Sequence, residues 1–544
     1  MRTRLALTLG LAMIAGGAMA QSAVDAYMVT PTQLRGSARF IGMGGAFTSL
    51  GGDLTCMTQN PAGLGIYRKS DIGLTFDISM RSYNSTTPTD KYDDSETRVK
   101  FDNFGYVGAV RLDNETMPFF QWGVGYNRIG VFDRMMSGYN NPTETSLTNY
   151  IAGYTNGVPS GDLLDEKGAS YDPYANPDND WLGVLAYNAF MINNGTGADD
   201  NYDGLFQNGT TGDALYHVRE RGYTDEYNID FAGNISDMFF WGIGVGIVDM
   251  DYTRSTYYSE SMENALVYDQ SNDGLGAGNA GFALTNYKNV SGTGANLKVG
   301  VIVRPIEMLR IGVAVHTPTW MHLTHYGYGE VDYNYTPYGN LTDRPTNSGY
   351  CSTPDFDYTS RLNTPWRFMA GASVMLGDRG VLSLDYERVA YNDMHMKQEN
   401  FNSYLGGDYV NNSYANEDIK SYFKAANILR VGAEVRLNNH FAARAGFNYQ
   451  STNVKNEASD GALQIYTSGT DPSYRFDKDT YNICLGLGYR YKAWYVDLAY
   501  QHTRQTGTMH AYTPYPINGV MCNTPQASVT DKYNNIVIST GIRF

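Results

Sequence analysis

The stretch that decides the fold class is Asn482–Lys492, which reads NICLGLGYRYK. Its apolar and aromatic side chains alternate with cysteine, glycine and charge, a period of two residues that is typical of a β-strand with one apolar face. The same alternation recurs in ILRVGAEVRL (428–437), FAARAGFNYQ (441–450) and AWYVDLAYQH (493–502). A soluble sandwich buries such a face inside, whereas a transmembrane barrel turns it towards lipid.

The lengths of the connections favour the barrel. Short connections alternate along the chain with long stretches rich in Tyr, Asn and Asp, of which the longest is 141–222. Outer-membrane barrels have short periplasmic turns, long extracellular loops and an even number of strands, so we predict an all-β, transmembrane antiparallel β-barrel of about 14 strands over residues 71–544. The predicted strands are 71–84, 98–112, 119–140, 223–235, 238–261, 287–305, 309–333, 355–376, 380–398, 421–437, 441–455, 479–492, 493–512 and 534–544.

Composition agrees with this class. The 544 residues include 45 Tyr and 59 Gly and carry a formal net charge of −16, which argues against a nucleic-acid partner. The chain ends NNIVISTGIRF, an alternating strand whose last residue, Phe544, is the kind of terminus that barrel-assembly machinery favours. We therefore expect this machinery, outer-membrane lipid and lipopolysaccharide as partners, and the bacterial outer membrane as the location.

The first residues predict export. Arg2 and Arg4 precede a short apolar run, and Ala18-Met19-Ala20 matches a signal-peptidase site, so residues 1–20 are interpreted as a signal peptide. Export permits disulfides, and Cys351 and Cys522 both fall in predicted long loops where they are able to pair. The four cysteines have no C-x-x-C spacing, which argues against a zinc site.

Residues 21–70 have no predicted strand, yet they are apolar and rich in glycine rather than charged. A barrel of about fourteen strands has an interior that must be filled or will leak. We therefore predict that this segment is a hatch, or plug, in the lumen. Arg39 and Asp53 are expected to meet lumen charges such as Glu434, Arg444 or Asp497.

The hatch also carries a resemblance. The stretch SARFIGMGGAFTSLGGDLTCMTQNPAGLG (37–65), with Asn60, Pro61, Ala62 and Gly63 as its motif, resembles the N-terminal hatch of the FadL/TodX family of outer-membrane transporters for hydrophobic compounds. HTPTW (316–320) resembles the family as well. The resemblance implies uptake of hydrophobic small molecules such as long-chain fatty acids. It also implies a route, in which extracellular loops capture the ligand, the hatch rearranges, and the ligand leaves sideways through the barrel wall near the third strand.

The resemblance further implies that the loops after the fifth and seventh strands form the capture groove. The first of these loops, 262–287, is unusually apolar, and we predict ligand contacts there, although the same residues are able to form a loop core instead; they are Leu266, Val267, Leu275, Phe282 and Leu284. In the third strand, Gly123, Gly125 and Gly130 mark a possible bulge, which suits the lateral gap. The long acidic stretch 141–222 departs from the family and is expected to cover the groove or to bind something else.

The sequence gives weaker evidence for metal binding or catalysis. Asp199, Asn201 and Asp203 match the first half of an EF-hand loop, but position twelve is Thr210 rather than Glu, so calcium is a minor possibility beside an ordinary turn, and no other cofactor is predicted. We predict no enzyme. Two alternatives remain open, a haem receptor that uses His316, His322 and His325, and a structural or adhesive barrel.

Overall fold

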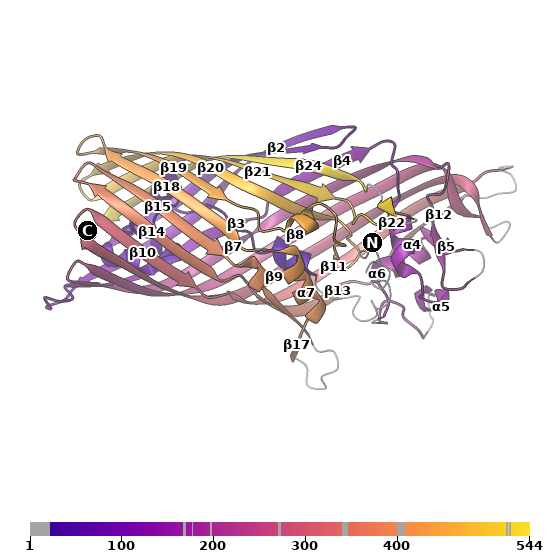
Figure 1. Cartoon of the computed structure of the whole chain (residues 1–544), viewed down its shortest axis with the longest axis horizontal. Helices are drawn as coiled ribbons and strands as arrows, with labels where there is room; N and C mark the ends of the chain where they lie inside the picture. The colour runs from indigo at the N-terminus through magenta and orange to yellow at the C-terminus, as the bar shows by residue number, and fades with distance from the viewer. Residues whose placement is uncertain are drawn as a thin grey trace, which may run out of the picture.

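The computed structural model describes residues 22–166, 170–176, 178–195, 198–269, 274–339, 346–399, 408–517, 520–521 and 524–544. The predicted signal peptide, residues 1–20, and Cys522 lie outside these residues. Within them, the chain forms a closed barrel of fourteen antiparallel passes. The first strand closes it by pairing with the last, from Asp71 opposite Arg543 to Thr86 opposite Ser528. The predicted fold class is confirmed (Figure 1).

Several passes consist of more than one strand, because the backbone pairing is interrupted. In chain order the passes are β1 (Asp71–Thr86), β2 (Lys91–Arg111), β3 (Phe119–Val131) with β4 (Arg134–Asn140), β7 (Thr211–Ile235), β8 (Phe239–Asp269), β9 (Gly274–Ile306), β10 (Leu309–His316) with β11 (Trp320–Pro337), β12 (Asn347–Ser352) with β13 (Phe356–Asn363) and β14 (Arg367–Leu376), β15 (Gly380–Val389) with β16 (His395–Glu399), β18 (Ala426–Arg436), β19 (Phe441–Gln450), β20 (Tyr474–Tyr491), β21 (Trp494–His510) and β24 (Gln526–Arg543). The short strands β5 (Ile192–Asn194), β6 (Tyr202–Gly204), β17 (Tyr409–Asn411), β22 (Pro516–Ile517) and β23 (Val520–Met521) lie in the loops.

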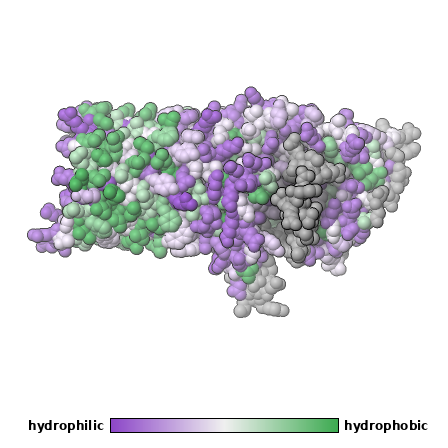
Figure 2. All heavy atoms as spheres, viewed as in Figure 1, coloured by the Kyte–Doolittle hydropathy of each residue, from purple (hydrophilic) through white to green (hydrophobic). Residues whose placement is uncertain are grey.

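An apolar band surrounds one end of the barrel. On β20, the side chains of Ile483, Leu485 and Leu487 are each 56% exposed, whereas Cys484 between them is buried and faces the lumen. Figure 2 shows the hydrophobic surface gathered over the end where β10, β14, β15 and β18 are joined by short turns. This alternation exposes apolar side chains where lipid replaces water, which is the arrangement of a transmembrane barrel. In the described part of the chain, the helices are all too short or too polar to cross a membrane.

Beyond this band the strands continue as a hydrophilic extension. The hairpin β8–β9 is the longest part of it, so the predicted capture loop 262–287 is not a loop, because most of its described residues pair as two strands. Four other strands also extend beyond the apolar band. They therefore begin earlier than predicted, at Lys91, Thr211, Tyr474 and Gln526. The predicted strand 421–437 is partly wrong, since helix α7 (Ser413–Tyr422) precedes β18.

The described part of residues 141–210 folds into a cap on this extension, whereas residues 211–222 of the predicted loop belong to β7. The helices of the cap are α4 (Leu147–Thr155), α5 (Ser160–Leu163) and α6 (Trp181–Asn188). Ser146 and Asp180 cap α4 and α6 by accepting hydrogen bonds from backbone N–H groups at the helix starts. The apolar faces of these helices pack on β8, β9 and β11 in one buried cluster. The short elements η2 (Tyr391–Asp393) and α8 (Asn456–Ser459) lie in other loops.

Candidate ligand cavity and lateral opening

The N-terminal segment lies against the lumen face of the barrel. It contains α1 (Ala23–Met28), α2 (Ala38–Gly42), α3 (Cys56–Gln59) and η1 (Pro61–Ile66). Wall glycines allow its backbone to approach closely. A Cβ at Gly446 would lie 2.1 Å from the Gly44 nitrogen, and one at Gly242 would lie 2.2 Å from the Ala62 nitrogen. Glycine is required at such positions because any side chain would displace the segment. We refer to residues 22–69 as the hatch.

The Asn-Pro-Ala-Gly motif forms the turn that seats η1. The Asn60 side chain accepts from the Ala62 N–H at 3.1 Å and donates to the Thr48 carbonyl at 2.6 Å. Pro61 occupies the first position of η1, where a missing N–H costs nothing. Gly63 packs on Cys56 and Gly51, and a Cβ there would lie 2.8 Å from the Cys56 Sγ. The motif therefore has a packing role in holding the hatch against the wall.

Ion pairs that are largely shielded from solvent attach the hatch to the barrel wall. Arg39 lies 2.9 Å from Glu434, which also contacts Arg444 at 2.6 Å, and Arg444 in turn lies 2.6 Å from Asp497. The expected meeting of Arg39 with these lumen charges is confirmed. Asp53 is different, because it accepts hydrogen bonds within the hatch from the Ser37 hydroxyl and from the Thr55 N–H.

A cavity of about 160 Å³ lies between hatch residues Val29–Arg35 and the barrel wall. It lies where three neighbouring passes are interrupted, at 317–319, 364–366 and 390–394. At these positions the residues lie outside the regular strand ladders. Apolar side chains cover part of the cavity surface: Val29, Leu34, Val248, Met250, Met321, Leu323, Leu362 and Ile428.

Several polar atoms of the cavity lining are buried without a hydrogen-bond partner. They are Nε of Arg35, Nε and Nη1 of Arg430, Oε1 of Gln59, Oδ1 of Asn296 and Oγ1 of Thr224. The remaining Arg430 nitrogen, Nη2, donates to Glu387. A buried guanidinium with two unused donors is costly unless another group supplies acceptors. The cavity therefore combines apolar walls with donors suited to a carboxylate or another acceptor.

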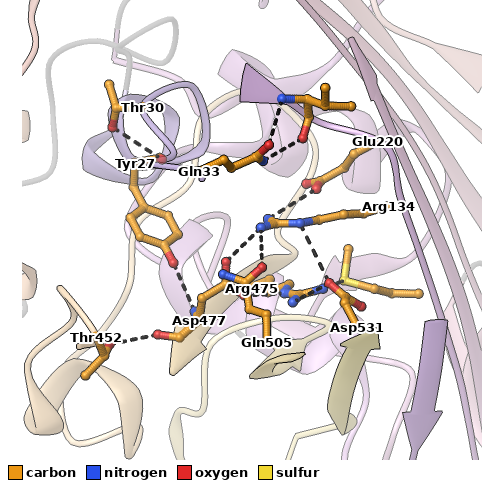
Figure 3. Close-up of polar contacts among 12 residues, drawn as sticks. Tyr27, Thr30, Gln33, Arg134, Glu220, Thr452, Arg475, Asp477, Gln505 and Asp531 are labelled. Atoms are coloured by element: carbon orange, nitrogen blue, oxygen red, sulfur yellow. Dashed lines mark hydrogen bonds and ion pairs between the residues drawn. The ribbon is translucent and has the colours of Figure 1, made fainter. Parts of the chain in front are cut away.

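A second cavity of about 80 Å³ lies on the other side of the same hatch segment and is lined mainly by charged and polar side chains. Figure 3 shows its ion-pair network. Arg134 lies 3.0 Å from Asp477 and 3.8 Å from Asp531, and Arg475 lies 2.7 Å from both carboxylates. The Tyr27 hydroxyl of α1 accepts from the Asp477 N–H at 2.9 Å, which links the hatch to this network.

The third pass loses its regular strand pairing between β3 and β4. β2 pairs with β3 only from Asn103 to Arg111, and β4 pairs with β7 but, among the described residues, not with β2. The break is held inside the barrel, because Lys100 lies 2.5 Å from Asp133 and the Tyr83 hydroxyl donates to the Asp133 carbonyl at 3.0 Å. The backbone pairing of the third pass with β2 is therefore interrupted at this point, and a lateral opening there stays a prediction.

The glycines predicted to mark the lateral gap lie in two different environments. Gly123 and Gly125 face the hatch, where a Cβ would lie 2.9 Å and 2.6 Å from Met57 atoms. Gly130 lies at the register shift between β3 and β7, one residue before the end of β3. The break itself is formed by residues 132–133, which sequence reasoning did not single out.

The predicted ligand-contact residues lie in the cap rather than at the cavity. Val267, Phe282 and Leu284 are buried in the cap core, and Leu266 and Leu275 lie on the same hairpin and are half-buried. Ligand contact at these positions stays a prediction. In the predicted calcium loop, the Asp199 carboxylate accepts from the side chains of Ser160 and Asn194, whereas Asn201 and Asp203 adjoin or lie in the small hairpin β5–β6. Calcium binding there also stays a prediction.

The three histidines proposed as haem ligands do not converge. His316 lines the cavity, and its Nε2 is 2.8 Å from the Gln59 carbonyl. His325 is buried, stacks on Tyr358 and is 2.8 Å from the Ser360 hydroxyl, whereas His322 faces outward beside Tyr409. The geometry brings only His316 to the cavity. Arg430 was visible in the sequence as a charge on the lumen face of its strand, but its role was missed.

No protein-family model and no curated protein sequence matches the chain. A solved FadL homologue of Pseudomonas aeruginosa is 14% identical, with alignment over 96% of this chain and 100% of that one and a TM-score of 0.50. The toluene transporters TodX of Pseudomonas putida and TbuX of Ralstonia pickettii are each 14% identical over 94% of this chain and 99% of theirs, with TM-scores of 0.48 and 0.43. The chain is a transmembrane β-barrel of the outer-membrane type and shares its fold with the FadL homologue. The predicted resemblance is confirmed at the level of fold.

Proposed function

We propose that the protein takes up hydrophobic small molecules across the outer membrane, and that long-chain fatty acids are among its ligands. The observation that carries this proposal is the cavity between hatch residues Val29–Arg35 and the interrupted wall. It is partly apolar, it is bounded by a segment that is not part of the barrel, and the break in the third pass touches the same segment through Gln33.

The proposed route is capture at the extracellular cap, passage to the cavity, rearrangement of the hatch and exit through the gap between β2 and β4. A lateral exit keeps the ligand out of water. Exposing an acyl chain to water costs about 0.8 kcal/mol per CH₂ group, so a long chain needs a path with apolar walls. The charged second cavity makes the opposite side of the hatch unsuitable for an acyl chain.

The unused donors of Arg430 favour an amphipathic ligand over a pure hydrocarbon. A ligand carboxylate that accepts from Nε or from Nη1 would form a charge-assisted hydrogen bond, which is stronger than a hydrogen bond between neutral groups. Ile428 on the same strand, Met321 on β11 and Leu362 on β13 also line the cavity and supply apolar contacts for the adjoining chain.

The size of the cavity determines whether a ligand binds with the hatch in place or only after the hatch moves. Its volume of about 160 Å³ is close to the roughly 150 Å³ of an apolar protein cavity that holds benzene. A small aromatic molecule therefore fits the cavity as it stands. A long-chain acid requires residues Thr30–Arg35 to move, which is the hatch rearrangement in the proposed route.

The test is a titration of the refolded protein in detergent with oleate and, in parallel, with hemin, followed by tryptophan fluorescence and by the haem absorption band. The proposal is supported if oleate binds saturably and methyl oleate, which lacks the carboxylate, displaces it only weakly. Hemin binding with a histidine- or tyrosine-ligand band and no oleate binding would replace the fatty acid by haem. Absence of binding for both ligands and for toluene would contradict uptake of hydrophobic compounds.

A further inference from the structure

A second cleft lies outside the barrel, on the surface of the extracellular cap. Its volume is about 130 Å³, and it lies between the helices α4 and α6 and the segment 464–472 that follows α8. This cleft is separate from the cavity at the hatch, because the two share no lining residue. The proposed transport route does not use it.

Three tyrosine rings form the walls of the cleft. Tyr150 and Tyr154 lie one turn apart on α4, with ring centroids 5.2 Å apart and planes at 68°. Tyr150 is fixed from behind by stacking on Tyr512, at a centroid distance of 5.7 Å. Tyr466 approaches from the opposite segment and is 37% exposed. Rings that meet at steep angles around a small space are the arrangement that binds quaternary ammonium groups.

The cleft also carries negative charge without a compensating cation. Asp178 and Asp180 line it, and none of its described lining residues is Lys, Arg or His. Asp180 accepts hydrogen bonds from neutral groups, namely the N–H groups of Leu182 and Gly183 and the Tyr154 hydroxyl at 3.0 Å. Over residues 141–210 the sequence contains ten acidic residues and one basic residue, Lys167. The field of the cap therefore attracts cations.

A buried polar atom supplies an independent sign of a ligand. Thr155 is 3% exposed and lines the cleft, and its hydroxyl oxygen has no hydrogen-bond partner. Native structures rarely leave a buried hydroxyl unsatisfied, because the lost hydration is not repaid. A ligand in the cleft that carries a polar substituent would satisfy this hydroxyl, while Leu182 and Pro472 would contact its apolar part.

We infer that this cleft is a binding site for a small organic cation of the alkyl- or quaternary-ammonium class, held by the rings of Tyr150, Tyr154 and Tyr466 and by the charge of Asp178 and Asp180. The rings attract the cation through their negative faces. The carboxylates add attraction that a neutral molecule of the same shape lacks.

The experiment uses the full-length mature protein in detergent and isothermal titration with choline and with 3,3-dimethyl-1-butanol, which has the same shape without the charge. Choline is expected to bind about tenfold more tightly than the neutral analogue, because the cation contributes both ring and carboxylate attraction. Tyr466→Ala and Asp178→Asn are each expected to weaken choline binding about fivefold. The matched controls are Tyr414→Ala and Glu417→Gln on the exposed face of α7, which are expected to change nothing.

Three outcomes would overturn the inference. They are equal binding of the two probes, unchanged choline binding in both cleft variants, and no saturable choline binding by the wild type. Because Tyr466 and Asp178 are on the surface, both variants are expected to fold, and an unchanged melting temperature checks this. Oleate binding measured on the same variants is expected to equal that of the wild type, which distinguishes failure at this cleft from failure of the proposed uptake function.

Discussion

The side-chain amide of Gln33 binds both backbone groups of Val131. Its Nε2 donates to the Val131 carbonyl at 2.8 Å, and its Oε1 accepts from the Val131 N–H at 3.1 Å (Figure 3). Val131 is the last residue of β3, directly before the break in the third pass. The hatch therefore supplies, at this residue, the pairing that a neighbouring strand would supply in a regular barrel. Movement of the hatch must break these two hydrogen bonds.

We expect Gln33→Ala to loosen the break in the third pass. Loss of both bonds leaves the Val131 backbone groups without partners, at a cost of about 1–3 kcal/mol. Hydrogen exchange of residues 129–133 is expected to become faster, while exchange in β20 and β21 stays unchanged. Gln526→Ala on the exposed face of β24 is the control. Equal exchange in Gln33→Ala and in the wild type would show that the hatch does not hold the break.

We expect Arg430→Gln to weaken the binding of oleate about tenfold to a hundredfold, since a hydrogen bond to a charged group contributes about 1.5–3 kcal/mol. Oleyl alcohol, which has the same chain without the carboxylate, is expected to lose much less affinity. Arg388→Gln, an exposed arginine on β15, is the matched control. Equal losses for oleate and oleyl alcohol would contradict a carboxylate site at Arg430.

We expect Gly446→Ala to displace the hatch and to make the barrel leak. The new Cβ would lie 2.1 Å from the Gly44 nitrogen. Because both atoms belong to the backbone or are attached directly to it, the clash is relieved only if the hatch backbone moves. Single-channel conductance in planar bilayers is expected to rise. Gly281→Ala, whose nearest neighbours lie 3.9 Å away, is expected to remain closed. A closed Gly446→Ala channel would argue that the hatch tolerates a shift at this contact.

We expect the cap to become less stable as pH rises. Burial raises the pKa of Glu260, in the extension of β8 above the apolar band, from 4.5 to about 7. The folded cap therefore binds this proton more tightly than the unfolded chain does, so its stability is greatest below pH 4.5 and falls as pH rises through 7. Proteolysis of α4, whose Leu147 N–H donates to Glu260 at 2.8 Å, is expected to be faster at pH 8 than at pH 5. In Glu260→Gln this difference is expected to shrink. A pH difference that persists in that variant would assign it to another group.

The barrel was predictable because lipid enforces a strict two-residue period, as in Ile483 to Leu487. The same rule fails above the membrane, where both faces of a strand meet water or the cap. Lys91–Arg98 reads KYDDSETR and has no apolar face, so the start of β2 was placed too late. Phe282 and Leu284 are apolar because helices cover them, and sequence alone does not distinguish that core from a ligand groove.

The candidate site was predictable only in outline. The hatch motif carried a signal, because Asn60 caps η1 and Pro61 occupies its first position, as the residue types of the motif favour. The cavity carried none, since it arises from interruptions in three adjacent passes and from a hatch segment more than two hundred residues away in the chain. The contact of Gln33 with Val131 likewise joins residues 98 positions apart, and the sequence around either residue does not predict it.

The most direct measurement is photo-crosslinking with a diazirine-bearing fatty acid, followed by mass spectrometry of the labelled peptides from protein in detergent. The account predicts labels on hatch residues 29–35 and on Met321 or Leu362, all of which line the cavity, and suppression of these labels by excess oleate. Labels confined to the outward-facing apolar band, with no competition by oleate, would contradict the account.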